Sequence, residues 1–212
     1  SKNIGNFFDE KGIDFELQRP KYFRSLRSEK IRKEIRGNDI LDIGCHYGHL
    51  AKSYISNQNF VGLDLSMKGL IYSEKLIAKG YYLHAKAQEL PFQDKSFDTI
   101  VCSEVIYYLD EPIETLKKCR AILKKRGKII VVCSNKFHAY LGGTIGTFLK
   151  MRPKDINQTC YYQKDIKIML KNSGFEDITS IGFGVLPFKW SKFLDKTPLS
   201  KIGFIHITTA YR

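Results

Sequence analysis

Strand-like apolar runs alternate with helical patterns along most of this 212-residue chain. Asp39–Ile43 and Asn59–Asp64 have the length and composition of buried strands, and Lys68–Lys79 carries apolar residues at helical spacing. Such alternation is typical of an α/β fold, in which helices cover both faces of a mainly parallel sheet. Ligands of such sheets bind at the carboxyl ends of the strands. We therefore expect the functional site at that edge.

The same reasoning gives the rest of the expected elements. Helices are predicted for Tyr22–Ile35, His49–Ser56, Pro112–Leu123 and Gln163–Asn172. Further strands are predicted for Tyr81–Lys86, Asp98–Ser103, Lys128–Ser134, Phe175–Ile181 and Ile202–Tyr211. The length of the chain fits one domain, 1–212, with a basic helical segment at 1–36.

The most informative segment is the loop that follows the first expected strand. It reads Asp42-Ile43-Gly44-Cys45-His46-Tyr47-Gly48, so a strand runs directly into a glycine and a helix opens near a second one. Glycines permit a tight turn, and the unpaired N–H groups of the following helix then face a ligand. Asp64 ends the next strand, where a carboxylate commonly accepts hydrogen bonds from ribose hydroxyls. A turn that binds nothing is the alternative at this point.

The loop resembles the first motif of class I S-adenosylmethionine-dependent methyltransferases, DxGCGxG, with His46 where that family usually has glycine. His tolerates a positive φ better than most residues. Three further stretches resemble the family in order and spacing: the AQELPFQDKSFD run at 87–98, the LKKRGK run at 123–128 and the 162–175 run that ends in GF. The resemblance implies a Rossmann-like sheet of seven strands, with the last strand antiparallel and beside the fifth.

The resemblance also implies a cofactor, S-adenosyl-L-methionine, and a set of residues that bind it within the half of the chain at 37–134. Ala87 and Gln88 are expected to flank the adenine, and Cys102 and Ser103 to pass under the methionine part. The full expected set is Asp42, Gly44, Cys45, His46, Gly48, Asp64, Leu65, Ala87, Gln88, Cys102 and Ser103. No metal site is expected, because the HxxH at 46–49 lacks helical i, i+4 spacing.

Catalytic candidates are few. His138 follows the fifth expected strand and is the first choice for a general base, with a solvated loop histidine as the alternative. Tyr107 and Tyr108 follow the fourth strand, where they could bind an acceptor or simply pack, and Tyr108 is the second catalytic candidate. His84 and His206 lie within strands and are interpreted as structural.

Two stretches interrupt the α/β alternation, 135–162 and 182–201, and we expect them to form a cap over the strand ends. The second contains Trp190, Phe193 and Leu194 at helical spacing beside a stripe of lysines. Such a basic amphipathic segment could close over an apolar, anionic substrate or lie on an anionic membrane surface. It could also pack on the sheet as an ordinary helix.

Charge is distributed unevenly, and the net charge of the chain is +13. Residues 37–115 carry 6 basic and 11 acidic side chains, which suits a cationic cofactor, whereas residues 116–212 carry 19 basic and 5 acidic ones. No apolar run reaches about 18 residues, there is no signal-peptide pattern, and the five cysteines form no CxxC pair. We expect a cytoplasmic protein with free thiols, and peripheral contact with an anionic membrane stays open.

The predicted function is methyl transfer to a small-molecule acceptor, apolar or anionic. The chain has no Pro-Pro pair and no Pro-Cys pair, which base-modifying methyltransferases would require, so we do not expect a nucleic-acid partner. Two other classes stay open. One is an RNA or protein methyltransferase that docks through the basic C-terminal half, and the other is a non-catalytic protein that binds the cofactor.

Overall fold

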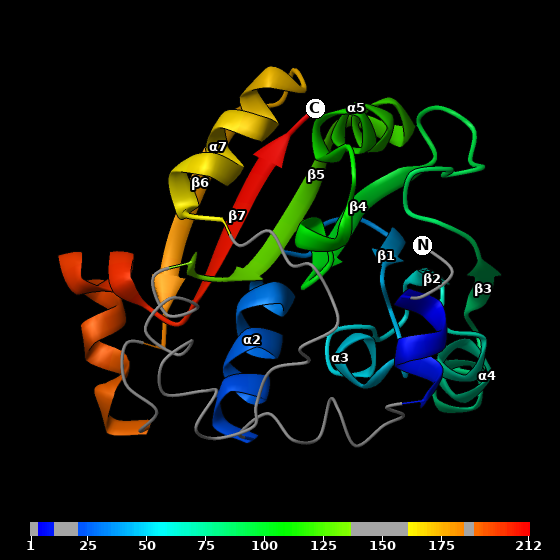
Figure 1. Ribbon diagram of the computed structural model, residues 1–212, viewed down its shortest axis with the longest axis horizontal. Coiled ribbons are helices and arrows are strands. Elements are labelled where there is room, and N and C mark those ends of the chain that lie inside the picture. Colours follow the sequence, from blue (N-terminus) through cyan, green and yellow to red (C-terminus); the bar gives the residue numbers. More distant parts are fainter. Residues whose placement is uncertain (1–3, 11–20, 137–160, 185–188) are drawn as a thin grey trace.

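A computed structural model describes residues 4–10, 21–136, 161–184 and 189–212 (Figure 1). Its centre is a seven-stranded sheet in the order β3-β2-β1-β4-β5-β7-β6. The strands are β1 (Asp39–Ile43), β2 (Asn59–Asp64), β3 (Tyr81–His84), β4 (Phe97–Ser103), β5 (Leu123–Ser134), β6 (Glu176–Phe183) and β7 (Ile205–Tyr211). The expected strands are thus all present.

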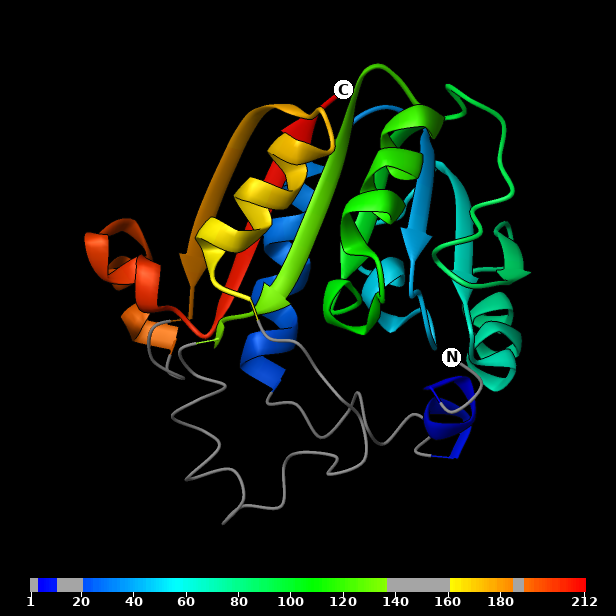
Figure 2. The same ribbon diagram turned by 45° about the horizontal axis from the view of Figure 1, so that its top comes forward.

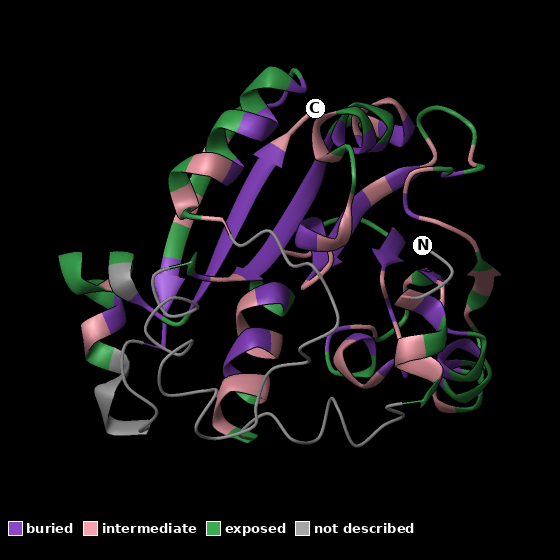
Figure 3. Cartoon of the chain, viewed as in Figure 1, coloured by how far each residue is buried: buried purple, intermediate pink, exposed green. Residues whose placement is uncertain are grey.

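β7 is inserted between β5 and β6 and runs antiparallel to both, whereas the other neighbouring pairs are parallel. Its register runs from Lys128 opposite Tyr211 to Ser134 opposite Ile205 on the β5 side. The predicted placement of the last strand is confirmed. The strand is buried along 205–210, as Figure 3 shows, because sheet neighbours and helices surround it.

Helices cover both faces of the sheet (Figure 2). α5 (Pro112–Ile122) and α7 (Gln163–Asn172) pack on one face, with Leu116, Ile166 and Leu170 in the core beneath them. α2 (Lys21–Glu34), α3 (His49–Lys52) and α4 (Met67–Leu76) cover the other face through a second core that includes Leu26, Ile31, Ala51 and Leu70. Residues 4–10 form a further short helix. Two apolar faces of one sheet thus explain why apolar stripes recur along the chain.

Three local features differ from the expectation. β5 begins at Leu123 rather than Lys128, because Leu123 pairs with Phe97 before an irregularity at Arg126, whose φ is 62°. The amphipathic stretch after residue 188 forms two 3-10 helices, η2 (Lys189–Lys196) and η3 (Pro198–Ile202), instead of an α-helix. A third 3-10 helix, η1 (Ile106–Tyr108), follows β4. No helix among the described residues has the length and apolar character needed to cross a membrane.

Candidate active site

The turn between β1 and α3 requires glycine at two positions. Gly44 has a φ of 76°, and a Cβ there would lie 2.1 Å from Cγ2 of Val105. Gly48 has a φ of 71°, and a Cβ there would lie 2.3 Å from Oγ of Ser73 on α4. His46 lies between them with a φ of 47°, so the histidine adopts the positive φ expected of it. The sequence therefore makes a turn that brings backbone close to the carboxyl ends of β1 and β2.

Asp64 ends β2 beside this turn. Its Oδ2 accepts a hydrogen bond from the N–H of His46 at 2.8 Å, and its Oδ1 accepts one from the N–H of Ser66 at 2.8 Å. The side chain is almost fully buried, and this burial raises the pKa of the carboxyl group, while the backbone donors act in the opposite direction. The carboxylate is thereby oriented and tied to the glycine turn.

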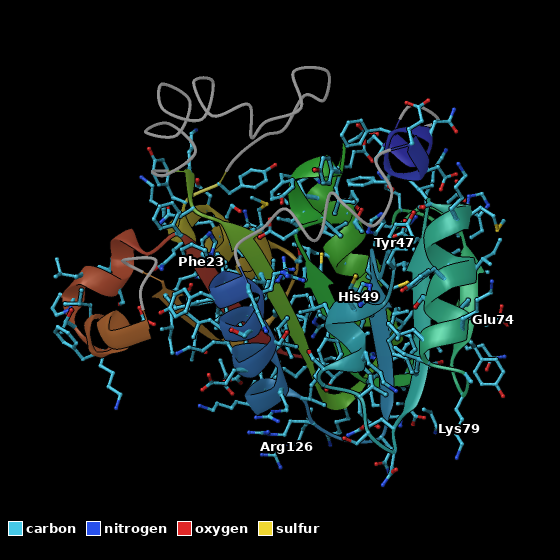
Figure 4. All side chains as sticks on the ribbon, turned by 90° about the horizontal axis from the view of Figure 1, so that it is seen from below. Phe23, Tyr47, His49, Glu74, Lys79 and Arg126 are labelled. Carbon is cyan, nitrogen blue, oxygen red and sulfur yellow. The ribbon has the colours of Figure 1, made fainter. Side chains whose placement is uncertain are left out.

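A cavity opens at the carboxyl ends of β1, β2 and β4. Ten of the predicted residues line it: Gly44, Cys45, His46, Gly48, Asp64, Leu65, Ala87, Gln88, Ser103 and Tyr108. Asp42 and Cys102 are buried in strands behind this wall and do not line it. Figure 4 shows Tyr47 and His49 at this end of the sheet, whereas Arg126 lies at the opposite end.

Asp42 interacts with protein groups behind the wall. Its Oδ2 accepts a hydrogen bond from the hydroxyl of Tyr54 at 2.6 Å, and the guanidinium of Arg27 lies near enough to favour the charged carboxylate. Burial outweighs both and raises the pKa of Asp42 to about 7. Burial also raises the pKa of the Cys45 thiol well above its usual value, which makes Cys45 a poor nucleophile.

The cavity has one wall that the sequence analysis did not foresee. Ile4 and Phe8, from the helix at 4–10, line it, and the Phe8 ring meets the rings of His46 at 5.3 Å and Tyr108 at 5.8 Å between centroids. This helix is fixed to the N-terminus of α4, because Oδ1 of Asp9 accepts hydrogen bonds from Oγ of Ser66 at 2.5 Å and from the N–H of Lys68 at 3.1 Å. The i, i+3, i+4 spacing of Ile4, Phe7 and Phe8 was a signal for it.

Arg27 and Glu104 also line the cavity and were not singled out from sequence. Arg27 comes from α2 and is 3% exposed, so it is a rare buried cation in an otherwise acidic region. Glu104 follows β4 with a φ of 63°. Its carboxylate accepts hydrogen bonds from the hydroxyls of Tyr107 at 2.5 Å and Ser134 at 3.0 Å. Glu104 directly follows Cys102 and Ser103 in the stretch that resembles the family, which was a signal for it, whereas Arg27 belongs to no such pattern.

The other candidates fall in different places. His138 and Cys160 lie outside the described residues. Nε2 of His84 is 3.0 Å from the Leu65 carbonyl oxygen, and His206 is buried in β7 with Nε2 3.2 Å from Sγ of Cys133. Among the residues that the structure covers, no group of three potential metal ligands occurs.

The expected cap is described only in part. Residues 137–160 and 185–188 lie outside the described residues. η2 and η3 pack against β6 at the edge of the sheet opposite β3, and the side-chain amide of Asn135 donates to the carbonyls of Lys201 and Gly203 at 3.1 Å each. Phe193 on η2 is 59% exposed. The role of these stretches as a substrate cap stays a prediction.

Residues 41–131 match a family model described as a methyltransferase domain. The ubiquinone biosynthesis O-methyltransferase of Roseobacter denitrificans is 28% identical over 200 residues, which cover 89% of this chain and 75% of that protein.

Two solved structures are similar in fold. A chain described as an S-adenosylmethionine-dependent methyltransferase from Thermotoga maritima has a TM-score of 0.72 at 17% identity, with 99% of this chain and 96% of that chain covered. The phosphoethanolamine N-methyltransferase 2 of Haemonchus contortus, in complex with S-adenosylhomocysteine, has a TM-score of 0.67 at 17% identity. The match covers 89% of this chain and 53% of that chain. At this identity, both bear on the fold alone.

Proposed function

We propose that this chain is a class I S-adenosylmethionine-dependent methyltransferase and that the cavity around Asp64 binds its cofactor and presents it to a small-molecule acceptor. The observation that carries the proposal is the convergence of the glycine turn, the buried Asp64 carboxylate and ten predicted residues on one cavity. This cavity lies at the strand ends where such folds bind their ligands.

The lining of the cavity fits the cofactor in its chemistry. Two backbone amides hold Asp64, and a carboxylate has about four acceptor sites, so it can also take hydroxyls of a ribose. Oγ of Ser103 and Nε2 of His49 are buried and have no hydrogen-bond partner among the described residues. Arg27 is suited to the carboxylate of the amino-acid part, because guanidinium pairs with carboxylate in a bidentate manner. Ala87, Gln88 and Leu65 supply a surface for the adenine.

The bound cofactor supplies a methyl group on a positively charged sulfur. The chain then has to hold the acceptor in line with that methyl group and keep water out. Correct positioning alone can supply about 7–11 kcal/mol of the barrier. Carboxylates of Asp64, Glu104 and Asp110 line the cavity and favour a positively charged ligand.

The acceptor is proposed to be a small molecule with an apolar part. Phe8, Tyr107 and Tyr108 give the cavity apolar walls, which is typical of small-molecule sites. Similarity to a ubiquinone biosynthesis O-methyltransferase favours the same conclusion. The excess of basic over acidic residues in the sequence of 116–212 favours an anionic group on the acceptor or on a membrane that carries it. The protein is proposed to act in the cytoplasm.

Calorimetric titration with S-adenosylhomocysteine tests the cofactor site. Asp64→Asn removes the charge that strengthens the proposed hydrogen bonds, each worth about 1.5–3 kcal/mol. We therefore expect affinity to fall at least about 10-fold. Asp94→Asn, at an exposed position, is the matched control and should bind as the wild-type chain does. Unchanged affinity in Asp64→Asn would remove Asp64 from the site.

Transfer of a radiolabelled methyl group into fractionated cell extract tests the acceptor class. The label should enter the small-molecule or lipid fraction. Label in RNA or protein instead would favour the docking alternative, which predicts binding that weakens steeply with salt. Cofactor binding without label in any fraction would favour a non-catalytic protein.

A further inference from the structure

Glu104 has an unusual backbone conformation at the edge of the cavity. Its φ of 63° is rare for a residue other than glycine, and its N–H donates to the Val132 carbonyl of β5 at 2.7 Å. Such a conformation is energetically unfavourable and persists only where the surroundings enforce it, often at functional sites. The chain therefore keeps a carboxylate at this point against a backbone preference.

Two elements orient that carboxylate. The Tyr107 hydroxyl, from η1, donates to Oε2 at 2.5 Å. The Ser134 hydroxyl, at the end of β5, donates to Oε2 at 3.0 Å and lies 3.3 Å from Oε1. Glu104 is half-buried and lines the same cavity as Asp64. The carboxylate is thus held at the wall of the cavity by donors from two different elements, η1 and the end of β5.

We propose that Glu104 is the general base of the transfer and that the acceptor is a hydroxyl compound. The inference rests on the proposed function. As the acceptor oxygen bonds to the methyl carbon, the carbon–sulfur bond breaks and its electron pair stays on sulfur, which becomes neutral. The hydroxyl proton passes to the Glu104 carboxylate. The hydroxyls of Tyr107 and Ser134 hold this carboxylate in position. Tyr107 and Ser134 are positioning residues, because they act through Glu104.

A general base speeds the reaction only when the acceptor hydroxyl still carries its proton. This requirement distinguishes a catalytic Glu104 from one that only makes structural hydrogen bonds. 4-Methylphenol is neutral near pH 8, because an ordinary phenol has a pKa of about 10. 4-Nitrophenol is largely ionised there and needs no base. Both are para-substituted phenols of similar size, so the same cavity can be tested with each.

The experiment measures radiolabelled methyl transfer to both phenols by the wild-type chain, Glu104→Gln, Tyr107→Phe and the control Glu114→Gln, which changes an exposed residue on α5. In Glu104→Gln, transfer to 4-methylphenol should fall about 10²–10⁴-fold while transfer to 4-nitrophenol changes by less than about 3-fold. Tyr107→Phe should show the same selectivity with a smaller loss. Glu114→Gln should match the wild type with both.

Three outcomes overturn the inference. If Glu104→Gln lowered methyl transfer to both phenols equally, Glu104 would have a structural role only. If transfer to neither phenol fell, Glu104 would take no part in the reaction. A wild-type chain that binds S-adenosylhomocysteine yet methylates neither phenol, but methylates 4-methylaniline or a carbon acid, would overturn the hydroxyl class. Failure to bind S-adenosylhomocysteine at all would instead overturn the proposed function itself.

Discussion

Burial affects the pKa values of single residues in this molecule more than their hydrogen-bonding and charged partners do. Asp42 has a hydroxyl donor and a nearby guanidinium, which both favour the charged carboxylate, yet burial raises its pKa to about 7. His206 in β7 shows the opposite case for a base, because burial lowers its pKa to about 4. In both residues the neutral form is favoured, which is what loss of water dictates.

The pKa of Asp42 predicts a pH dependence of stability. Between about pH 4 and 7 the folded chain keeps a proton that the unfolded chain has released, so the free energy of unfolding falls as pH rises. Asn cannot titrate. As pH rises across this range, the free energy of unfolding of the wild type should therefore fall relative to that of Asp42→Asn, by about 4 kcal/mol at most.

Urea denaturation at several pH values measures that difference. His206 acts in the opposite direction, since its stabilising effect is present above about pH 6.5 and lost as pH falls toward 4. The pH dependence of wild-type stability therefore contains the effects of both residues. The difference in unfolding free energy between Asp42→Asn and the wild type reports on Asp42. A difference that stays constant from pH 4 to 7 would contradict the raised pKa.

At the scale of elements, the helix at 4–10 closes one side of the cavity. Asp9 anchors it to the first turn of α4, Phe8 contacts the rings of His46 and Tyr108, and Gly5 lies so close to Leu65 that a Cβ would be 2.6 Å from its carbonyl oxygen. Short elements that wall a ligand cavity often open for ligand exchange, and we expect the helix at 4–10 to act as such a lid.

Asp9→Ala should loosen this helix. It removes two hydrogen bonds to α4, and each contributes about 0.5–1.5 kcal/mol. We expect faster amide hydrogen exchange in residues 4–10 and faster release of S-adenosylhomocysteine, while exchange in β4 and β5 stays unchanged. Glu10→Ala, at an exposed neighbouring position, is the control. Equal exchange rates in Asp9→Ala and the control would mean that Asp9 does not hold the helix.

At the scale of the whole molecule, β7 joins two parts of the sheet. It pairs with β5 on one side and β6 on the other, although all three are separated along the chain by other elements. Residues 205–210 are buried, so both cores depend on a strand that ends the sequence. Arg212 extends the pairing of β7 with β5, because its backbone N–H donates a hydrogen bond to the Gly127 carbonyl at 2.9 Å.

Removal of residues 205–212 should therefore abolish cooperative unfolding, because β5 and β6 lose their shared neighbour and expose their edges. Thermal unfolding followed by circular dichroism measures this. Removal of Arg212 alone should keep a cooperative transition at lower stability, by about 1–3 kcal/mol. A sharp transition in the longer truncation would show that β1 to β6 fold without β7.

The sequence by itself determined the fold class, the order of most elements and much of the cavity lining. Apolar periodicity and turn residues are local signals, and they predicted β1, β2 and α7 with the observed bounds. The glycine turn was predictable too, because positive φ and close neighbours at 44 and 48 require glycine. Asp64 was predictable from its place at the end of the second strand.

Only the tertiary structure decided which distant side chains meet in the cavity. Phe8, Arg27 and Glu104 come from three separate segments of the chain, and no local pattern says that their side chains share one cavity. Likewise, the burial that raises the pKa of Asp42 depends on neighbours far away in sequence. Periodicity records which face of an element is apolar, but desolvation and contact depend on what packs against that face.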